Sequence, residues 1–512
     1  MPVPSSAPVL SCAEAGAWEK KILHDEAAEW TAMAAAGRGI AHAILEDFRE
    51  IGGLPAVARL LVLAGKGNNG GDALLVAATI LAEYPGAHAV VVPCFGLDRL
   101  RPLARRALDA LLSQAPGRTT IKPATEALGH DQRYALGVDG IFGYQFRAPM
   151  DEATGQLVEQ VNRHPGIEFR AAIDLPSGVG AVSAPTPFRA DFTYAAGIVK
   201  TPVLQAGNAA AVGRLRYVDL GFFATEPGDL PATDRVLVPS ILAPLAELRP
   251  SLSDKRTYGH LCVVGGSHSY PGAVMLAVRA ALRSGTGLVT AFVPEKFAPE
   301  YAATHPEVMW VGCPVTASGG LAPATIGLIR TRTAKASAML IGPGLAADPA
   351  TIALVEQIVA EATYPLVLDA DALRPEVIAR VLGKPFICTP HAGEYERIKP
   401  ALYAGDRLLA AQAALVLKGP LTRVTDGRIS YYSPFGGPVL ARGGSGDMLA
   451  GLCGGLLAQQ PADLLLAACR GVVWHGRAAD LLARTHGQVA VETSELLEQL
   501  GPALKTTLCP TH

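Results

Sequence analysis

Short apolar segments recur along the whole chain, and most of them end in glycine, amide or acidic residues. Between several of these segments the apolar residues return with the spacing of a helix. The apolar segments predict strands that end near residues 64, 139, 174, 221, 264, 293, 341, 368, 388 and 417. The helical patterns predict helices over residues 13–48, 73–82, 273–282 and 448–457. Strands that alternate with helices in this way predict an α/β protein with doubly wound sheets.

The chain of 512 residues is long enough for more than one domain. Between residues 222 and 255 the pattern loses its periodicity and prolines become frequent. These are Pro227, Pro231, Pro239, Pro244 and Pro250. A proline-rich segment without periodicity is typical of a join between domains. We therefore predict two domains, at residues 1–226 and 227–512.

The first half carries a glycine-rich loop between a predicted strand and a predicted helix. The loop reads Gly-Lys-Gly-Asn-Asn-Gly-Gly-Asp over residues 65–72. It would present backbone N–H groups at a helix N-terminus, where phosphate is the usual anion. The amides of Asn68 and Asn69 would add oxygens for a hard cation, or hydrogen bonds for ribose and phosphate. A bare Asn-Gly turn is the structural alternative.

Acidic residues end two further strands of the first half. Asp139 ends one strand, and Asp174 ends another and is soon followed by Ser177. The carboxyl ends of parallel strands meet at one edge of a sheet. We therefore expect these side chains to share one crevice with the loop at 65–72.

Three motifs in this order make the first half resemble the YjeF N-terminal domain of the NAD(P)H-hydrate epimerase family. They are Gly-Asn-Asn-Gly-Gly-Asp, Asp-Gly-Ile-Phe-Gly and Asp-Leu-Pro-Ser-Gly. The resemblance implies a Rossmann-like sheet that binds a hydrated nicotinamide dinucleotide. It makes Asp174 the catalytic acid and base, and it makes Asn69, Asp139 and Ser177 the ligands of a potassium ion. The substrate contacts that it implies are Asn68, Asn69, Gly70, Gly71, Asp72, Asp174 and, against the dinucleotide phosphates, Gly143, Tyr144, Gln145, Phe146, Arg147, Ala148 and Pro149.

Some positions of the first half differ from that family's pattern. Ala73 and Ala78 stand where the family usually has glycine and arginine, and residues 32–37 lack an acid that the family has there. A first half that binds a dinucleotide without turning it over, as a sensor or scaffold would, therefore stays open as an alternative.

A second glycine-rich loop, Ala-Arg-Gly-Gly-Ser-Gly-Asp over residues 441–447, precedes the helix predicted at 448–457. The glycines and the helix N-terminus again predict a site for phosphate. Asp447 lies where the loop becomes helix, and a carboxylate there would take the proton of a hydroxyl during phosphoryl transfer. An N-cap role for Asp447 is the structural alternative. Arg442 would either reach a phosphate or point to solvent.

Four more polar residues follow predicted strands of the second half: Asp369, Asp371, His391 and Lys418. Taken singly, the acids would suit turns, His391 would suit a cap or the core, and Lys418 would suit the surface. Lys418 follows four apolar residues and precedes a glycine, which indicates that its stem is buried. Because all four follow strands of one sheet, we expect them to share one crevice with the loop at 441–447.

The second half resembles the ribokinase-like superfamily and, within it, the NAD(P)H-hydrate dehydratase family. The resemblance covers residues 255–480. It rests on Gly-Gly-Ser at 265–267, Gly-Pro-Gly-Leu at 342–345, Asp-Ala-Asp-Ala-Leu at 369–373, Thr-Pro-His-Ala-Gly-Glu at 389–394, Lys-Gly at 418–419 and the second glycine loop. It implies a hydrate site that is lined by Ala273, Gly344, His391 and Asp447. It implies an adenine-nucleotide site made of Lys418, Gly419, Pro420, Leu421, Thr422 and Gly446.

With both halves in one chain, the resemblance implies a bifunctional isomerase and lyase that repairs hydrated NADH and NADPH. The N-terminal domain would interconvert the R and S hydrates and hold the potassium ion. The C-terminal domain would dehydrate the S hydrate with Mg²⁺ and with ADP as phosphoryl donor, giving AMP and phosphate. The resemblance also suggests a homo-oligomer. The second glycine loop alone would equally allow a kinase of a small alcohol, such as a vitamin precursor or sugar, with a non-catalytic dinucleotide-binding N-terminal domain.

Composition narrows the choice of partners and compartment. The net charge is −2 and aromatic residues make up only 6%, so we expect no nucleic acid partner. No apolar run is long enough to span a membrane, and the first residues lack the features of a signal peptide. The eight cysteines show no metal-ligand or redox spacing, so we expect mostly buried free thiols. Together these features predict a soluble cytoplasmic protein.

Overall fold

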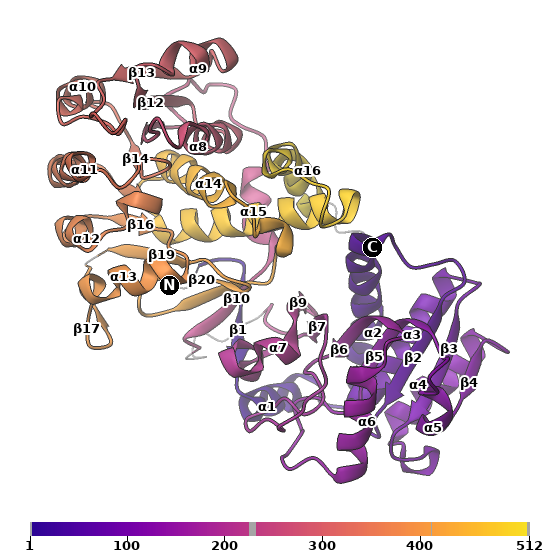
Figure 1. The fold of residues 1–512 in the computed structure, drawn as a ribbon. Coiled ribbons are helices and arrows are strands. Elements are labelled where there is room, and N and C mark those ends of the chain that lie inside the picture. Colours follow the sequence, from indigo (N-terminus) through magenta and orange to yellow (C-terminus); the bar gives the residue numbers. More distant parts are fainter. Residues whose placement is uncertain (1–2, 225–231, 411, 509–512) are drawn as a thin grey trace. The chain divides into compact units, whose positions relative to one another are not determined.

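The structure is a computed structural model that describes residues 3–224, 232–410 and 412–508. The chain divides into two compact units (Figure 1). The N-terminal unit holds Ala7–Val236 together with Ala483–Gly487. The C-terminal unit holds Leu237–Leu482 together with the described residues 3–6 and 488–508. Each unit therefore contains a short segment from the opposite end of the chain.

The chain passes from one unit to the other at Val236, shortly after the join that the sequence predicts at 226/227. Pro227 and Pro231 of that join lie outside the described residues. β10 (Asp234–Leu237) follows them, so the N-terminal unit continues past these prolines. Pro239 and Pro244 lie in η5 (Pro239–Leu245), a 3-10 helix. Pro239 is the first residue of this helix, where the missing N–H has no partner to lose, and Pro244 lies inside it.

A seven-stranded sheet forms the centre of the N-terminal unit, in the order β4-β3-β2-β5-β6-β7-β9. All of its strand pairs are parallel. Its strands are β2 (Arg59–Ala64), β3 (His88–Pro93), β4 (Thr119–Ile121), β5 (Tyr134–Gly140), β6 (Ile167–Ile173), β7 (Phe192–Ala196) and β9 (Arg214–Val218). Outside this seven-stranded sheet, β1 (Ser6–Leu10) runs parallel to β8 (Val199–Lys200), with Leu10 opposite Lys200. The predicted parallel α/β architecture is confirmed.

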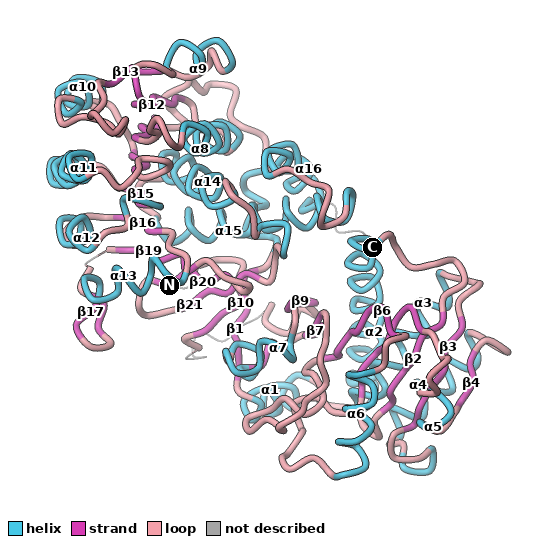
Figure 2. The backbone as a smooth tube through the Cα atoms, in the orientation of Figure 1, coloured by secondary structure: helices cyan, strands magenta, loops and turns pink. Residues whose placement is uncertain are grey.

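The helices of the N-terminal unit connect these strands (Figure 2). They are α1 (Cys12–Ile22), α2 (Glu26–Phe48), α3 (Asn68–Glu83), α4 (Pro102–Gln114), α5 (Ala124–Ala127), α6 (Glu152–Arg163) and α7 (Ala209–Val212). The single helix predicted over 13–48 is wrong, because the chain forms α1 and α2 as separate helices. Asp25 begins the second of them as its N-cap and accepts a hydrogen bond from the N–H of Ala28.

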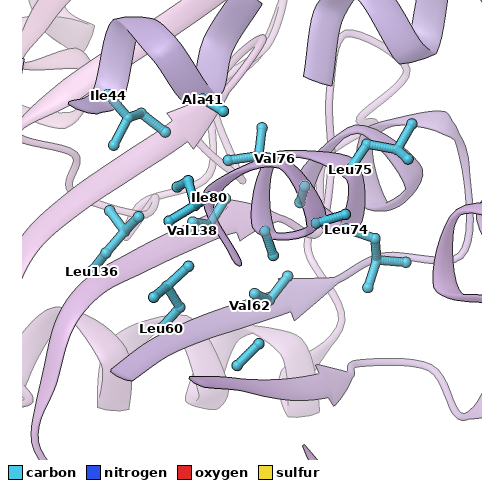
Figure 3. Packing of buried hydrophobic residues seen from close by; sticks show 14 of the residues in the cluster. Ala41, Ile44, Leu60, Val62, Leu74, Leu75, Val76, Ile80, Leu136 and Val138 are labelled. Carbon is cyan, nitrogen blue, oxygen red and sulfur yellow. The ribbon is translucent and has the colours of Figure 1, made fainter. Parts of the chain in front are cut away.

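The largest core of the N-terminal unit lies between the sheet and the helices α2 and α3. Figure 3 shows Ala41 and Ile44 of α2 near Val76 and Ile80 of α3 and the side chains of β2 and β5. The two helices approach closely at Gly37, where a Cβ atom would lie 2.6 Å from Cβ of Leu75. This packing fixes the start of α3, which carries the first glycine loop.

A buried ion cluster lies beside this core. The side chain of Asp47 is 0% exposed, and its Oδ1 lies 2.9 Å from Nη2 of Arg216 and 2.8 Å from Nη2 of Arg484. Burial alone would raise the pKa of Asp47, but the two arginines lower it to about 2. A strand was predicted near 218–221, but β9 is Arg214–Val218. Its arginines hid it from a search for apolar runs, and the buried Arg216 is neutralised there by Asp47 and Glu50.

The sheet of the C-terminal unit runs in the order β13-β12-β11-β14-β15-β16-β19-β20-β21. The strands from β13 to β19 are parallel, and β20 and β21 are antiparallel. They are β11 (His260–Val264), β12 (Leu288–Pro294), β13 (Met309–Cys313), β14 (Ala338–Ile341), β15 (Leu366–Leu368), β16 (Phe386–Cys388), β19 (Ala413–Leu417), β20 (Thr422–Thr425) and β21 (Ser430–Ser433). A small hairpin pairs β17 (Tyr403–Ala404) with β18 (Arg407–Leu408).

Nine helices accompany this sheet in the described part of the chain. They are α8 (Pro271–Arg283), α9 (Ala298–Thr304), α10 (Thr325–Arg332), α11 (Pro349–Glu361), α12 (Pro375–Val381), α13 (Ala392–Leu402), α14 (Ser445–Gln459), α15 (Leu464–His486) and α16 (Leu496–Leu508). α14 begins at Ser445, earlier than predicted, so the glycine loop already forms its first turn. Its glycines let it lie against α8, where a Cβ atom on Gly451 would lie 2.1 Å from the carbonyl oxygen of Ala277.

Replacing Gly451 with alanine should destabilise the C-terminal unit by about 1–3 kcal/mol, because the added methyl group has no space beside α8. Gly327→Ala is the matched control: this glycine also lies in a helix, but nothing lies within 4 Å of its added Cβ. Alanine there should stabilise by about 0.5–1 kcal/mol. The measurement is the urea concentration at which the C-terminal unit loses its tryptophan fluorescence. Equal midpoints for the two variants would contradict the close helix contact.

No helix among the described residues is long and apolar enough to cross a membrane. The seven described cysteines are free thiols, and Cys262, Cys313, Cys388, Cys453 and Cys469 are buried. Burial raises the pKa of Cys453 to about 12 and that of Cys262 to about 12, which keeps these thiols protonated. The prediction of mostly buried free thiols is confirmed for these residues, and Cys509 lies outside the described residues.

Candidate active sites

Segments that follow β2, β5 and β6 line a cavity of about 650 Å³ in the N-terminal unit. A volume of this size is typical of a pocket for an organic ligand. Most of the substrate contacts implied by the family resemblance line it. These are Asn68, Asn69, Asp72, Gly143, Tyr144, Gln145, Phe146, Arg147, Pro149 and Asp174. Strand ends that lie far apart in sequence are therefore brought to one crevice, as expected for a parallel sheet.

Gly70, Gly71 and Ala148 do not belong to that lining. Gly70 lies in the first turn of α3, and a Cβ atom there would lie 2.1 Å from the carbonyl oxygen of Gly65. A Cβ atom on Gly71 would lie 2.8 Å from the sulfur of Met33. These two glycines therefore let the helix start close to the strand and to α2. The helix N-terminus then faces the cavity with Asn68, and Lys66 and Arg101 add positive charge there.

Asp174 stands at the end of β6 with a left-handed backbone, at φ +65°. This conformation is strained for most residues and best tolerated by Asp and Asn. Its Oδ2 accepts a hydrogen bond of 2.9 Å from the N–H of Tyr144, and its Oδ1 lies 2.5 Å from Nζ of Lys200. Lys200 is 2% exposed. Burial acts to lower the pKa of Lys200, but Asp174 and Glu19 outweigh it and raise that pKa above its ordinary value.

Lys200 and Glu19 are functional candidates that were not predicted from sequence. Lys200 ends a two-residue strand, β8, and Glu19 lies on α1, so neither belongs to a recognisable loop motif. Both line the cavity. Sequence offered one signal for Lys200, which is a lysine directly after the apolar run Gly-Ile-Val. Such a lysine is often buried and paired.

Two carboxyl groups of this cavity hold their protons more tightly than usual. Burial, helped by the charges of Asp174 and Glu19, raises the pKa of Asp72 well above its ordinary value. Burial also raises the pKa of Glu19. Carboxyl groups with perturbed pKa values inside a cavity are typical of active sites. The cavity therefore combines a paired lysine and carboxylate with a buried carboxyl group whose pKa is raised.

The three residues predicted to bind potassium lie near one another. Oγ of Ser177 donates to Oδ1 of Asp139 over 2.6 Å, and Oδ2 of Asp139 accepts from the N–H of Ser177 over 2.7 Å. Oδ1 of Asn69 lies 3.0 Å from where a Cβ atom on Gly143 would be. In the described part of the chain, no lysine or arginine pairs with the fully buried Asp139. Burial raises its pKa to about 6, although hydrogen bonds from Ser177 oppose this.

These donors fit a monovalent cation. Oδ2 of Asp139 accepts one hydrogen bond and keeps a free lone-pair position, whereas Oδ1 accepts from both Ser177 and the N–H of Ile141. The amide oxygen Oδ1 of Asn69, which faces Gly143, is the atom of this residue that could add to the site, because its Nδ2 is a donor only. A cation beside Asp139 would offset the cost of burying a carboxylate.

In the C-terminal unit, Asp447 lies in the first turn of α14. Gly444 is the N-cap, with φ +90°, and no side chain caps the helix. The alternative that Asp447 serves as the N-cap is therefore wrong. Burial, with the charges of Asp369 and Glu394, raises the pKa of Asp447 to about 7, although Lys418 opposes this. A carboxyl group with this pKa can act as a base near neutral pH.

Lys418 stands beside Asp447 at the end of β19. Its Nζ lies 3.0 Å from Oδ1 of Asp369 and 3.9 Å from Oε2 of Glu394, and its side chain is 21% exposed. A Cβ atom on Gly446 would lie 3.1 Å from this Nζ, so the glycine lets the ammonium group approach the helix start. Thr389 donates to Oδ1 of Asp369 over 2.7 Å. A phosphate placed at this helix start would meet both the N–H groups of α14 and a lysine.

His391 is the N-cap of α13, as its structural alternative predicted. Its Nδ1 accepts from the N–H of Gly393 over 3.0 Å, and Glu394 closes the capping box. The ring is nonetheless 62% exposed. A strand bridge places His391 beside Lys418. His391 can therefore cap the helix and still contact a ligand in the crevice.

The remaining predicted residues of the C-terminal unit lie in two places: Ala273 in the first turn of α8 with Gly344 beside it, and residues 419–422 after β19. Gly344 has φ +70°, and a Cβ atom there would lie 2.4 Å from the carbonyl oxygen of Tyr270 and 3.0 Å from Cβ of Ala273. Gly419, Pro420 and Leu421 form the turn from β19 to β20, and Thr422 closes it with a hydrogen bond to the carbonyl oxygen of Gly419.

Arg442 contacts the backbone beyond α15, and its contact with a phosphate stays a prediction, whereas Asp371 stays outside the cluster. Arg442 donates through Nη2 to the carbonyl oxygens of Gln488 and Val489, so it holds the glycine loop in place. Asp371 pairs with Arg374 over 3.6 Å, as expected for a residue of a turn.

No group of three metal-ligating side chains occurs among the described residues. This does not conflict with Mg²⁺, which commonly binds through substrate phosphates and waters with only one or two carboxylates. Asp447 and Glu394 are the carboxylates near the helix start that remain for such a complex, because Asp369 is paired with Lys418. The residues present therefore fit Mg²⁺ only as a partner of a bound nucleotide.

Comparison with known proteins matches two different families to the two halves of the chain. The family model described as NAD(P)H-hydrate dehydratase matches residues 261–502, and that described as YjeF-related protein N-terminus matches residues 31–202. The chain is 36% identical to the bifunctional NAD(P)H-hydrate repair enzyme Nnr of Gloeobacter violaceus, over 92% of this chain and 93% of that protein. It is 34% identical to the enzyme of the same name from Moorella thermoacetica, over 92% of each.

A solved structure similar to part of the chain is a ribokinase-like superfamily protein from Enterococcus faecalis V583. It is 27% identical, has a TM-score of 0.46, and the match covers 54% of this chain and 96% of that one. Two α/β units, each with polar groups gathered at the carboxyl ends of parallel strands, define an enzyme with two active sites. The chain belongs to the family of bifunctional NAD(P)H-hydrate repair enzymes.

Proposed function

We propose that this protein repairs hydrated NADH and NADPH in two steps. The N-terminal unit interconverts the R and S hydrates, and the C-terminal unit dehydrates the S hydrate at the expense of ADP. The observation that carries the proposal is the presence of both sites in one chain, the Asp174–Lys200 pair in one unit and the Asp447–Lys418 cluster in the other. A kinase of a small alcohol would have no use for the first site. That the enzyme works in the cytoplasm as a homo-oligomer stays a prediction.

The Asp174–Lys200 pair suits a reaction that moves one proton away and returns it. The hydrate carries a hydroxyl on the carbon next to the ring nitrogen, so its epimers interconvert when the ring opens and closes again. Opening takes the hydroxyl proton, breaks the carbon–nitrogen bond and leaves an aldehyde and an N–H group. Closing on the other face of the aldehyde reverses each step. Asp174 is placed to accept and return the proton, and Lys200 fixes its carboxylate.

The potassium ion of the family remains part of the proposal. Asn69, Asp139 and Ser177 would hold it, and its chemistry would be electrostatic, since it offsets buried negative charge beside the substrate. Asn68, Lys66 and Arg101 would face the dinucleotide phosphates at the start of α3.

In the C-terminal unit, Asp447 would accept the proton of the hydrate hydroxyl while that oxygen attacks the terminal phosphate of ADP. The N–H groups at the start of α14 and the ammonium of Lys418 would stabilise the phosphoryl group, and Lys418 to Thr422 with Gly446 would hold the nucleotide. AMP leaves. Phosphate then departs as the ring nitrogen donates its lone pair, and loss of a proton from the neighbouring carbon restores NADH or NADPH. Mg²⁺, when bound, would neutralise phosphate charge.

The experiment that tests the proposal follows the absorbance band of reduced nicotinamide after the full chain, Mg²⁺ and ADP are added to a mixture of both hydrate epimers. Full recovery of the band supports both activities. Recovery that stops at the share of the S hydrate, and then continues at the spontaneous rate, means that the N-terminal unit is inactive. No recovery with ADP or with ATP contradicts the repair function. A stable phosphorylated product from a small alcohol would favour the kinase alternative.

A further inference from the structure

We propose that Glu19 and Tyr144 form a clamp that holds Lys200 against Asp174, so that both act as positioning residues in epimerisation. The proposal rests on the epimerase function of the N-terminal unit and adds two residues to it. Tyr144 was expected to contact the dinucleotide phosphates, and Glu19 was not expected to have any role. Their contacts point instead toward the acid and base pair of the site.

The clamp is a closed ring of four polar contacts. Oδ1 of Asp174 accepts a hydrogen bond of 2.5 Å from Nζ of Lys200, and Oδ2 accepts one of 2.9 Å from the backbone N–H of Tyr144. Glu19 divides its oxygens in the same way: Oε1 lies 3.9 Å from Nζ of Lys200, and Oε2 accepts from the hydroxyl of Tyr144 over 2.7 Å. Each carboxylate therefore bridges the same lysine and the same tyrosine.

The tyrosine ring forms a further wall around the lysine. Nζ of Lys200 lies 5.2 Å from the ring centre of Tyr144, within the range of a cation–π contact. An ammonium group that is 2% exposed has lost most of its water, and withdrawal of a charge from water costs several kcal/mol unless partners replace it. Here two carboxylates and the face of an aromatic ring take the place of the lost water around the ammonium group. The lysine is thus held in one place, and with it the orientation of the Asp174 carboxylate.

The ring draws its members from separate parts of the chain. β1 pairs with β8, so that Leu10 lies opposite Lys200, and Ser11 then caps α1 directly after the strand. α1 is anchored by the buried residues Ala15 and Trp18, and Nε1 of Trp18 donates to the carbonyl oxygen of Phe222 over 3.2 Å. The rigid helix carries Glu19 to the cavity. A side chain positioned on a helix in this way is held more precisely than one on a loop.

The clamp has a consequence for the reaction. A carboxylate has about four lone-pair positions, and the clamp uses one on each oxygen of Asp174. The remaining positions are therefore aimed by Lys200 and Tyr144 together. Loss of the Tyr144 hydroxyl frees Glu19, and a freed Glu19 no longer fixes Lys200 from its second side. Because a small misplacement of a catalytic group can reduce the rate by about 100-fold, the effect should be seen in kcat.

The test is a double-mutant cycle with Tyr144→Phe, which keeps the ring, and Glu19→Met, which keeps the length of the side chain. Interconversion of a purified hydrate epimer is followed chromatographically without adenine nucleotide, so that the C-terminal site is idle. Each single variant should lower kcat about 10- to 100-fold with little change in KM. The kcat of the double variant should lie within about 2-fold of the kcat of the less active single variant, because both changes open the same ring of contacts.

Tyr134→Phe is the matched control, because it also removes a phenol hydrogen bond, of 2.8 Å to the carbonyl oxygen of Ala127, but lies outside the cavity lining. Its kcat should equal that of the wild type. Dehydratase activity on the S hydrate should be unchanged in every variant. Hydrogen exchange should be faster in peptides covering residues 143–147 of both clamp variants, which reports the released N–H of Tyr144 without any turnover.

Several outcomes would overturn the clamp alone while the wild type epimerises normally. They are single variants with the kcat of the wild type, losses that multiply in the double variant, a rise in KM without a fall in kcat, or unchanged exchange at residues 143–147. A wild-type chain that dehydrates the S hydrate but does not interconvert the epimers would instead overturn the epimerase function, and the clamp with it.

Discussion

Replacing Asp447 with asparagine is expected to reduce dehydratase activity by about 100- to 10,000-fold, the usual contribution of a positioned general base. Asparagine keeps the size of the side chain but cannot accept the hydroxyl proton. The fold should survive, because Asp447 does not cap α14 and the N-cap is Gly444. The measurement is the rate at which purified S hydrate returns to the reduced nicotinamide with ADP and Mg²⁺. Binding of ADP should change little.

The pH dependence of the wild type provides the control for this result. Burial raises the pKa of Asp447 to about 7, so the group is mostly protonated below that pH and ionised above it. A base must be ionised to act. The value of kcat/KM should therefore rise with pH up to about 7 and then level off, and this rise should be absent from the residual activity of the Asp447→Asn variant. A profile that stays flat from pH 5 to 9 would remove Asp447 from the role of base.

Replacing Asp174 with asparagine should lower the rate of epimerisation by about 100- to 10,000-fold. Dehydration of the S hydrate should continue at the wild-type rate. Asparagine is the appropriate replacement because residue 174 has φ +65°, a conformation that asparagine adopts more readily than alanine. The variant keeps an oxygen for the N–H of Tyr144 but loses its charge for Lys200. The two epimers are separated chromatographically, and their interconversion is followed over time.

Lys200→Met provides a second approach to the same site. Loss of the ammonium group leaves Asp174 and Glu19 without their shared cation. Removal of one partner from a buried ion pair lowers the free energy of unfolding by about 3–5 kcal/mol. Epimerase activity should fall in step with that of Asp174→Asn. If both variants interconverted the epimers at the wild-type rate, the crevice beyond β6 would not be the epimerase site.

The buried parallel strands were the easiest elements to predict. Those ending at Ala64, Val264 and Ile341 were recognised from sequence because a strand covered on both faces is an unbroken apolar run. The first glycine loop was recognised with its strand, since a helix that starts next to a strand needs a residue without a side chain at Gly70. The second glycine loop was recognised from its own sequence, ahead of an apolar helix. The family resemblance then supplied the chemistry.

Elements whose pattern depends on tertiary partners were missed. β9 contains Arg214 and Arg216, which read as surface residues until Asp47 and Glu50 neutralise them. No role was assigned to Lys200 for the same reason. A lysine becomes a buried catalytic partner only when two carboxylates from distant segments meet it, and no local spacing records that. The start of α3 was placed too late because glycine was read as a break, whereas the helix includes its glycines from Asn68 onward.

The segment at 483–487 has a consequence for the order in which the protein is made. The ribosome completes the first two hundred residues of the chain long before it reaches Arg484, yet Asp47 needs that arginine as well as Arg216 for its buried charge. Domains that emerge first usually fold first. Here the N-terminal unit reaches its final electrostatic state only after Arg484 has been synthesised. An N-terminal fragment expressed alone therefore lacks Arg484, and its Asp47 has one arginine fewer beside it than in the full chain.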